Sequence, residues 1–232
     1  MLALDNKVMR FFKIFFVALV AAVAMTGCDS PEYPDPAGER GTLSFDGFVL
    51  TAVDKTLASP VEIEVADFVV NVRNSSTGDV VASWTYGEIP ASVELLDGSY
   101  VVEAYNAELQ PAAWDAPYYY ASAQVRVYGK EETSMSAMQC TLANVAVSVE
   151  YSDAFSAVMG SDVAVRVEMA QGSAMDFTPG ETRRAYFSPG ATTLVAVLTG
   201  TVGGMDTMMQ QVITGIEPGQ HYQVTFSLDD EQ

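Results

Sequence analysis

The alternation of apolar and polar residues with a period of two constrains this chain more than any other feature of its sequence. Successive side chains of a β-strand point to opposite faces of a sheet, so this alternation is typical of strands that bury one face. The pattern recurs from residue 42 onward, and we expect a strand in each of these segments: 67–74, 79–86, 99–106, 122–129, 144–151, 162–169, 192–200 and 221–228.

Turn-forming residues separate these segments. Ser-Thr-Gly-Asp occupies 76–79, Asp-Gly occupies 97–98, and Pro-Gly occurs at 189–190 and again at 218–219. Short strands divided by such turns favour β-sandwiches. The segment DAFSAVM at 153–159 lacks alternation, and there we expect one helical turn.

The chain contains a weak internal repeat. LLDGSYVVEAY at 95–105 and IEPGQHYQVTF at 216–226 each place a turn before a strand that begins with tyrosine. A transition near Cys140 leaves about 100 residues on either side, which is a common domain size. We therefore expect an N-terminal sandwich at 41–139 and a C-terminal sandwich at 140–232.

The first 40 residues have a different character. Residues 1–27 combine a short basic region with an apolar run at 14–25, which is too short for the roughly 20 residues of a membrane-spanning helix. Met25-Thr26-Gly27-Cys28 resembles the lipobox of bacterial lipoproteins, in which the cysteine thiol receives a diacylglycerol. We expect a signal peptide at 1–27, lipid attachment at Cys28, and a proline-rich flexible linker at 28–40.

The charge of the chain excludes several classes of partner. It has 11 basic and 30 acidic residues, a net charge of −19. Such a protein is repelled by nucleic acid and by an anionic membrane surface, so only the lipid would hold it to the membrane. The excess of acid grows further without residues 1–27, which contain three of the basic residues and one of the acidic residues.

The sequence offers little for catalysis or metal binding. Its one histidine, His221, excludes a multi-histidine zinc site, and we expect this side chain to face solvent. Cys140 is the one cysteine outside the lipobox, and we expect it to be buried in a strand. With so many acidic residues, a pair of carboxylates that cleaves a glycosidic bond is not excluded, but no sequence pattern singles out such a pair. We expect no cofactor, no metal and no enzymatic activity.

One stretch has the character of a binding surface. It contains Trp114, Tyr118, Tyr119 and Tyr120, and such side chains stack on sugar rings or fill the pockets of protein partners. Tyr118 and Tyr120 share one face of a strand and Tyr119 takes the other. The alternative is that the inward rings belong to the core and the others cover an edge.

Four elements occur here in a characteristic order. They are the lipobox, LLDGSYVVEAY at 95–105, APYYYASAQVRVYGKEE at 116–132, and CTLANVAVSVEYSDAF at 140–155. This order resembles an uncharacterised family of lipoproteins from Gram-negative anaerobes, which is similar to the fimbrillin-like adhesins and type V pilins. The resemblance implies an all-β fold of two tandem transthyretin-like, or immunoglobulin-like, sandwiches.

The resemblance also implies a function. It predicts a non-catalytic surface protein, lipid-anchored in the outer membrane, with a structural or adhesive role. The alternative is a glycan-binding accessory lipoprotein of a polysaccharide-uptake system. Type V pilins are trimmed after an arginine, which points to Arg40, and are joined by a donated strand. Residues 229–232 are short and acidic, so we expect no donation from this tail and a monomer.

Overall fold

The computed structural model describes residues 38–169 and 172–228. The expected signal peptide at 1–27, the lipid attachment at Cys28 and most of the linker lie outside the described residues. The acidic tail at 229–232 also lies outside them.

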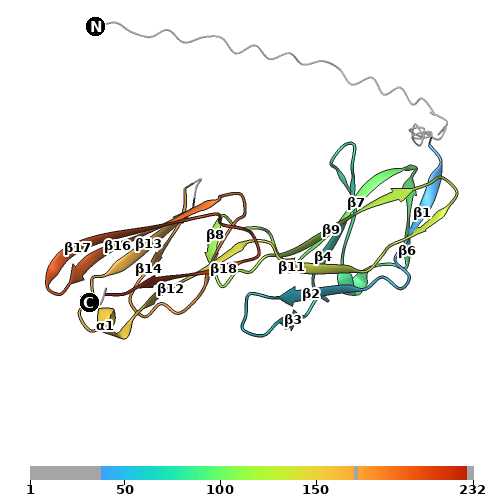
Figure 1. Ribbon diagram of the computed structural model, residues 1–232. Coiled ribbons are helices and arrows are strands. Elements are labelled where there is room, and N and C mark those ends of the chain that lie inside the picture. The colour runs from blue at the N-terminus through green and yellow to red at the C-terminus, as the bar shows by residue number, and fades with distance from the viewer. Residues whose placement is uncertain (1–37, 170–171, 229–232) are drawn as a thin grey trace, which may run out of the picture. The chain divides into compact units, whose positions relative to one another are not determined.

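The N-terminal sandwich is built from a three-stranded and a seven-stranded sheet (Figure 1). The three-stranded sheet has the order β10-β1-β6, with β1 (Arg40–Ser44), β6 (Ser92–Leu96) and β10 (Glu132–Ser134). The seven-stranded sheet has the order β3-β2-β11-β9-β7-β4-β5. Its strands are β2 (Leu50–Asp54), β3 (Val61–Ile63), β4 (Val69–Asn74), β5 (Val80–Thr85), β7 (Gly98–Tyr105), β9 (Tyr119–Val127) and β11 (Met138–Leu142), and a short 3₁₀ turn, η1 (Tyr86–Glu88), follows β5.

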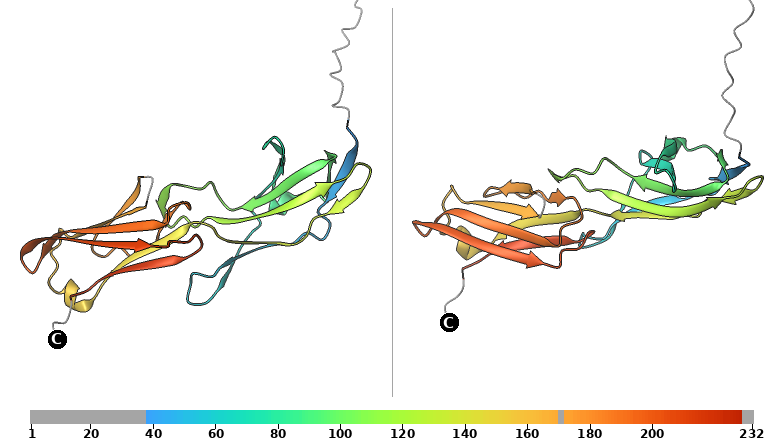
Figure 2. Two further views of the ribbon diagram at one scale, coloured as in Figure 1. Left: turned by 45° about the horizontal axis from the view of Figure 1, so that its top comes forward. Right: turned by 90° about the horizontal axis from the view of Figure 1, so that it is seen from above.

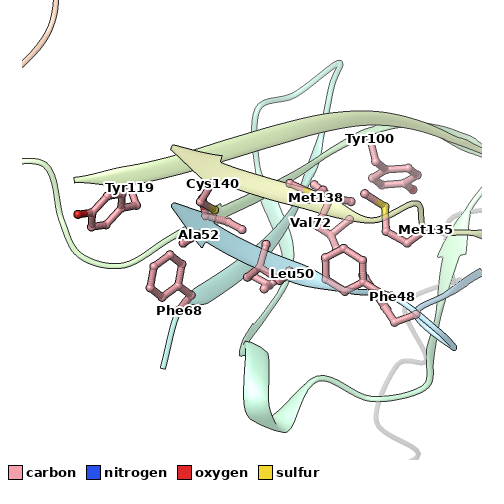
Figure 3. Close-up of a cluster of buried hydrophobic side chains, with 14 of the residues drawn as sticks. Phe48, Leu50, Ala52, Phe68, Val72, Tyr100, Tyr119, Met135, Met138 and Cys140 are labelled. Atoms are coloured by element: carbon pink, nitrogen blue, oxygen red, sulfur yellow. The ribbon is translucent and has the colours of Figure 1, made fainter. Parts of the chain in front are cut away.

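Alternate residues of these strands fill one apolar core. Along β7, Tyr100, Val102 and Ala104 are buried, as the repeat of turn and strand predicts. Leu43 of β1 is fully buried against the same cluster. Figure 3 shows Cys140 of β11 within this cluster, which confirms the expected burial of its thiol in a strand.

The C-terminal sandwich is built from two four-stranded sheets. The β12 sheet has the order β18-β12-β15-β8, with β8 (Ala112–Trp114), β12 (Val145–Tyr151), β15 (Ala185–Phe187) and β18 (His221–Phe226). The β16 sheet has the order β14-β13-β16-β17, with β13 (Ala164–Met169), β14 (Ser173–Phe177), β16 (Thr193–Val202) and β17 (Met205–Thr214). A second core of apolar side chains, including fully buried Phe155, Phe187 and Leu198, joins the two sheets.

The observed elements confirm the all-β sandwich architecture. Each segment with clear alternation contains a strand, namely β4, β5, β7, β9, β12, β13, β16 and β18. The expected helical turn is α1 (Asp153–Ser156), where the Ser152 hydroxyl caps the helix by accepting a hydrogen bond from the Phe155 amide. Several of the remaining strands are only three residues long, so alternation could not identify them.

The change from one sandwich to the other differs from our expectation. Cys140 lies within β11, which stays in the seven-stranded sheet, and the first C-terminal strand after it begins at Val145. By strand pairing, the change falls between Leu142 and Val145, so the expected boundary at Cys140 cuts a strand. In addition, β8 comes from the sequence assigned to the N-terminal sandwich but pairs with β15 of the C-terminal sandwich.

A buried polar network lies at this change of sandwich. Asp54 is 4% exposed, and its carboxylate accepts hydrogen bonds from the Thr56 hydroxyl (2.7 Å) and the Tyr119 hydroxyl (3.0 Å). Arg184, just before β15, donates to the Thr56 hydroxyl at 3.2 Å. Burial favours the protonated form of Asp54, but these hydrogen bonds and the Arg184 charge outweigh it and lower the pKa. The network links residues of both sandwiches through a charged group.

The placement of His221 corrects our expectation that it faces solvent. The imidazole is half-buried at the start of β18, and its Nε2 lies 2.9 Å from the Ser148 hydroxyl oxygen of β12. Burial and the nearby Arg184 charge lower the pKa of His221, against the opposing effect of Glu150 and Asp54. Strand alternation did not predict this environment because parallel pairing of β18 with β12 brings the Ser148 side chain beside the ring.

The burial of Cys140 predicts slow thiol chemistry in the native protein. Its side chain is 0% exposed, and burial raises its pKa to about 11. In a Cys28→Ser chain, where only Cys140 reports, we expect a thiol reagent to react at least about a hundredfold more slowly with the native than with the urea-unfolded protein. Equal rates would mean that the thiol is accessible.

The lowered pKa of His221 predicts a loss of stability in mild acid. As pH falls below about 6.5, the unfolded chain binds a proton that the folded chain resists, so the free energy of unfolding decreases until the folded ring also titrates. The loss is at most about 1.4 kcal/mol per pKa unit, reduced by solvent at this half-buried ring. Urea unfolding between pH 7.5 and 5.5 measures this, with His221→Gln as the control. A decrease of equal size in the variant would contradict the assignment.

Candidate functional site

The aromatic stretch at 114–120 does not form one surface. Trp114 ends β8 in the C-terminal sandwich, whereas Tyr119 begins β9 in the N-terminal sandwich. The turn between them contains Asp115, whose backbone φ is 49°, a left-handed value that is uncommon outside glycine. The expected strip therefore divides into two parts with different neighbours.

Trp114 packs within the C-terminal sandwich. Its ring meets Phe177 edge to face, with centroids 4.7 Å apart and planes at 75°. The Arg183 guanidinium lies over the ring at 4.8 Å from its centroid, and Glu181 in turn accepts hydrogen bonds from Arg183. Trp114 is half-buried, so the structural alternative describes it better than a role in ligand stacking.

Tyr119 points into the N-terminal core. It is 3% exposed, and its hydroxyl donates a hydrogen bond to the Asp54 carboxylate in the buried polar network described above. Burial, together with the hydrogen bond to the Asp54 carboxylate, raises its pKa. Tyr119 therefore cannot contact a ligand at the surface, and the expectation that it faces away from Tyr118 and Tyr120 is met.

Tyr118 and Tyr120 lie on the opposite face of the seven-stranded sheet, where they meet Tyr105 of β7. We call these three residues the tyrosine cluster. The rings of Tyr118 and Tyr120 stack with centroids 6.0 Å apart and planes at 20°, and Tyr105 lies 6.3 Å from Tyr118. Tyr105 pairs with Tyr120 across β7 and β9. Alternation predicts the shared face of Tyr118 and Tyr120, but not the third ring, which a neighbouring strand contributes.

Polar groups surround the tyrosine cluster. The Tyr120 hydroxyl donates to Glu103 at 3.3 Å, and the same carboxylate accepts hydrogen bonds from Arg73 at 3.2 and 3.3 Å. Asn71, which is 5% exposed, donates from its side-chain amide to the Tyr105 hydroxyl at 3.0 Å. Among the described residues, its carbonyl oxygen has no hydrogen-bond partner. The cluster thus combines aromatic rings with a charged pair and an unsatisfied polar atom.

Tyr118 and Tyr120 stay neutral over the physiological pH range. Burial raises the pKa of Tyr118 to about 12, and the other tyrosines and Glu103 add to this shift. Burial also raises the pKa of Tyr120. The hydroxyls therefore remain available as hydrogen-bond donors as well as acceptors.

A depression of about 350 Å³ adjoins the cluster at Tyr118. Its lining includes Asn106, Glu108 and Asp115. Asn106 holds the local backbone, since its amide donates to the Pro117 carbonyl and its oxygen accepts from the Tyr119 amide. A larger depression of about 510 Å³ lies elsewhere, along β2 and β3, and its lining includes Ile63, Glu62 and Glu64. Of these two depressions, we favour the smaller because its lining includes an aromatic residue, Tyr118, and that of the larger does not.

Arg40 lies in a strand rather than in flexible chain. It is the first residue of β1, pairs with Leu96 of β6, and its carbonyl accepts a hydrogen bond from the Lys130 amide. This corrects the expectation that Arg40 belongs to the flexible linker at 28–40. It also limits access to Arg40, because a protease binds its substrate in an extended, unpaired form. The arginine is exposed, but its backbone is not free of structure.

The other chemically capable side chains are dispersed. Cys140 contacts the Ala104 carbonyl at 3.5 Å, whereas His221 pairs with Ser148. Within residues 38–169 and 172–228, no three His, Cys, Asp or Glu side chains are close enough together to hold a metal ion. Within the same residues, no helix has the length and apolar character to cross a bilayer.

Solved structures with a similar chain path were found, at low identity. A fimbrial assembly protein from Parabacteroides distasonis is 10% identical, with 84% of this chain and 93% of that chain covered and a TM-score of 0.44. A candidate adhesin from Bacteroides ovatus is 9% identical, with 90% and 99% covered and a TM-score of 0.43. A protein from Bacteroides thetaiotaomicron, described as a candidate polysaccharide-binding protein, is 11% identical, with 82% and 92% covered and a TM-score of 0.47.

No curated protein matches the chain. One family does match, over residues 39–232, and it is described as a domain of unknown function, DUF4493. The match covers both sandwiches and nearly all of the described residues. The chain therefore belongs to the DUF4493 family.

Proposed function

We propose that this chain is a cell-surface protein, lipid-anchored in the outer membrane through Cys28, with a structural or adhesive role and no catalytic activity. The lipobox supports the anchor, and the acidic body would not bind an anionic membrane by itself. The observation that carries the adhesive part of the proposal is the tyrosine cluster. It is a preassembled set of rings on the outer face of the seven-stranded sheet.

Aromatic rings in this setting suit contact with another molecule. Tyrosine offers a large apolar area with few rotatable bonds and a polar tip, and it is frequent among the residues that dominate binding energy. The cluster is already ordered by stacking and by the hydrogen bonds of Asn71 and Glu103. Little side-chain entropy would therefore be lost when a partner binds.

A second candidate function is glycan binding by an accessory lipoprotein of a polysaccharide-uptake system. The observation that favours it is the combination of stacked rings with the neighbouring Glu103–Arg73 pair. Sugar hydroxyls donate and accept hydrogen bonds, so they complement such groups while the ring face packs on tyrosine.

Proteolytic trimming after Arg40 remains part of the proposal, with a condition set by the fold. Because Arg40 is paired within β1, cleavage needs local opening of that strand end. Leu43, the third residue after the cleavage point, is fully buried and would keep the rest of β1 in place. The product would be a body that begins at Gly41 and no longer carries the lipid.

The lipid anchor predicts a simple result for Cys28→Ser. The hydroxyl cannot form the thioether, so we expect an unprocessed precursor that takes up no labelled fatty acid. The matched control is Cys140→Ser, which removes the other thiol and should leave labelling intact. Fatty acid entering the Cys28→Ser chain would exclude this anchor.

The tyrosine cluster predicts a loss of surface binding in Tyr120→Ala. We expect adhesion of displaying cells, or binding to a glycan array, to weaken at least about tenfold, or about 1.4 kcal/mol, because the ring and its bond to Glu103 are both lost. Tyr128→Ala is the matched control, since Tyr128 is 51% exposed and lies outside the cluster.

The assay in which Tyr120→Ala loses binding indicates the class of the partner. Loss on the glycan array supports the accessory-protein alternative, and loss of cell or protein adhesion alone supports the adhesive role. Equal binding by Tyr120→Ala and Tyr128→Ala in both assays would remove the cluster from the proposal.

A further inference from the structure

The most exposed apolar side chains of the C-terminal sandwich gather on β17. This strand ends the β16 sheet, and Met208 and Met205 are 74% and 70% exposed, with Val212 at 54%. Figure 2 shows the orange-red β16–β17 hairpin at the margin of this sandwich. Exposed apolar residues scattered singly are ordinary, but a row of them along a sheet edge needs an explanation.

The geometry of the hairpin leaves one backbone edge of β17 available. Gly203 and Gly204 form the turn with φ of 59° and 79°, the values of a two-residue type I′ hairpin in which Val202 pairs with Met205. The backbone N–H and C=O groups of the odd-numbered residues of β17 then point to β16. Those of the even-numbered residues point away from it, namely Asp206, Met208, Gln210, Val212 and Thr214. Within the described residues, β16 is the sole strand that pairs with β17.

This edge lacks the protection that sheet-end strands usually have. Among the other end strands, β3, β8 and β10 are three residues long, β6, β14 and β18 have five or six residues, and β5 carries a register shift beside Val72 and Arg73. In contrast, β17 pairs with β16 over ten successive residues without a shift, and it contains no proline, lysine or arginine. Long, regular strand edges of this kind are templates for another strand.

We propose that β17 pairs with β17 of a second copy of this chain, antiparallel and centred on Gln210. In that register the residues whose backbone groups point away from β16 face the same residues of the other copy. Met208 then lies opposite Val212, and Asp206 lies opposite Thr214. The side chains of these even-numbered residues share the outer face of the β16 sheet, because the odd-numbered Met209 and Ile213 pair with buried Leu198 and Leu194.

The alternative register centred on Met209 fits less well. It also pairs residues whose backbone groups point away from β16, but it places Asp206 opposite Val212 and Met208 opposite Gln210. The Gln210 register instead joins apolar to apolar and places the charged side chain beside a hydroxyl. Two glutamine amides then meet at the symmetry axis, where they can hydrogen-bond to each other.

Charge favours a second copy meeting at this strand in particular. Two copies of a chain with net charge −19 repel over most of their surfaces. β17 carries one charged residue, Asp206. In the Gln210 register the two Asp206 side chains are eight positions apart along the strands, about 27 Å, which exceeds the physiological screening length of about 8 Å.

The proposed pair differs from the expectation of a monomer. That expectation rests on residues 229–232 as a poor donor strand, and those residues lie outside the described part of the chain. Pairing through β17 needs no donated segment. One strand pair makes a small interface, so the association should depend on concentration.

Site-specific disulfides in a full-length chain that carries Cys28→Ser test the register. Across the symmetry axis, the two residues at position 210 would have Cα atoms about 5.5 Å apart, within the range of a disulfide. Gln210→Cys should therefore give a cross-linked dimer on a non-reducing gel under mild oxidation. Met208→Cys is the matched control, since its two copies would lie about 14 Å apart along the strands. The native Cys140 is 0% exposed and should contribute no dimer.

We expect the dimer yield of Gln210→Cys to exceed that of Met208→Cys at least tenfold. Adding Val212→Lys to Gln210→Cys should abolish the excess, because each lysine would stand opposite Met208 of the other copy; thermal unfolding checks that the fold is kept. Equal yields from Gln210→Cys and Met208→Cys, or no dimer from a folded Gln210→Cys chain, would overturn the proposal. So would a dimer from Met209→Cys alone, which indicates the other register.

Discussion

The burial of one face of each sheet in two separate apolar cores is the constraint on which the rest of the structure depends. Fully burying a valine, leucine or phenylalanine contributes roughly 1.5–3 kcal/mol, and both cores contain many such side chains at 0% exposure. Each sheet therefore has one committed face. The surfaces left for contact are the opposite faces, where the tyrosine cluster lies, and the ends of the sheets, where β17 lies.

Alternation predicted the strands whose two faces differ most in environment. β4, β7, β12, β13 and β16 each have a clearly apolar inner face, so their side chains carry the signal. β17 has no such signal, because MDTMMQQVIT mixes methionine and glutamine on both faces and neither is deeply buried. β8 and β15 are too short for a period to appear. The alternation also contains no information on which strands pair with one another within each sandwich.

The candidate site shows the same limit at the level of single residues. The spacing of Tyr118, Tyr119 and Tyr120 was enough to place the first and third on one face and the second in the core. The partners of those rings come from other strands, with Tyr105 and Glu103 on β7 and Arg73 on β4. Their proximity depends on register between strands far apart in sequence, which a local pattern does not contain. Trp114 was grouped with the tyrosines by sequence alone, and the fold separates them.

The path of the chain between the sandwiches has a consequence for how the two sandwiches can evolve. The chain enters the C-terminal sandwich to form β8, returns to form β9 and β11, and then leaves again for β12. The buried Asn144 side chain fastens this crossing by bonding to the Ala116 carbonyl and the Tyr118 amide. A recombination event at any single point between the sandwiches would strip a strand from one of them. The two halves must therefore be exchanged, duplicated or lost together, although each has a core of its own.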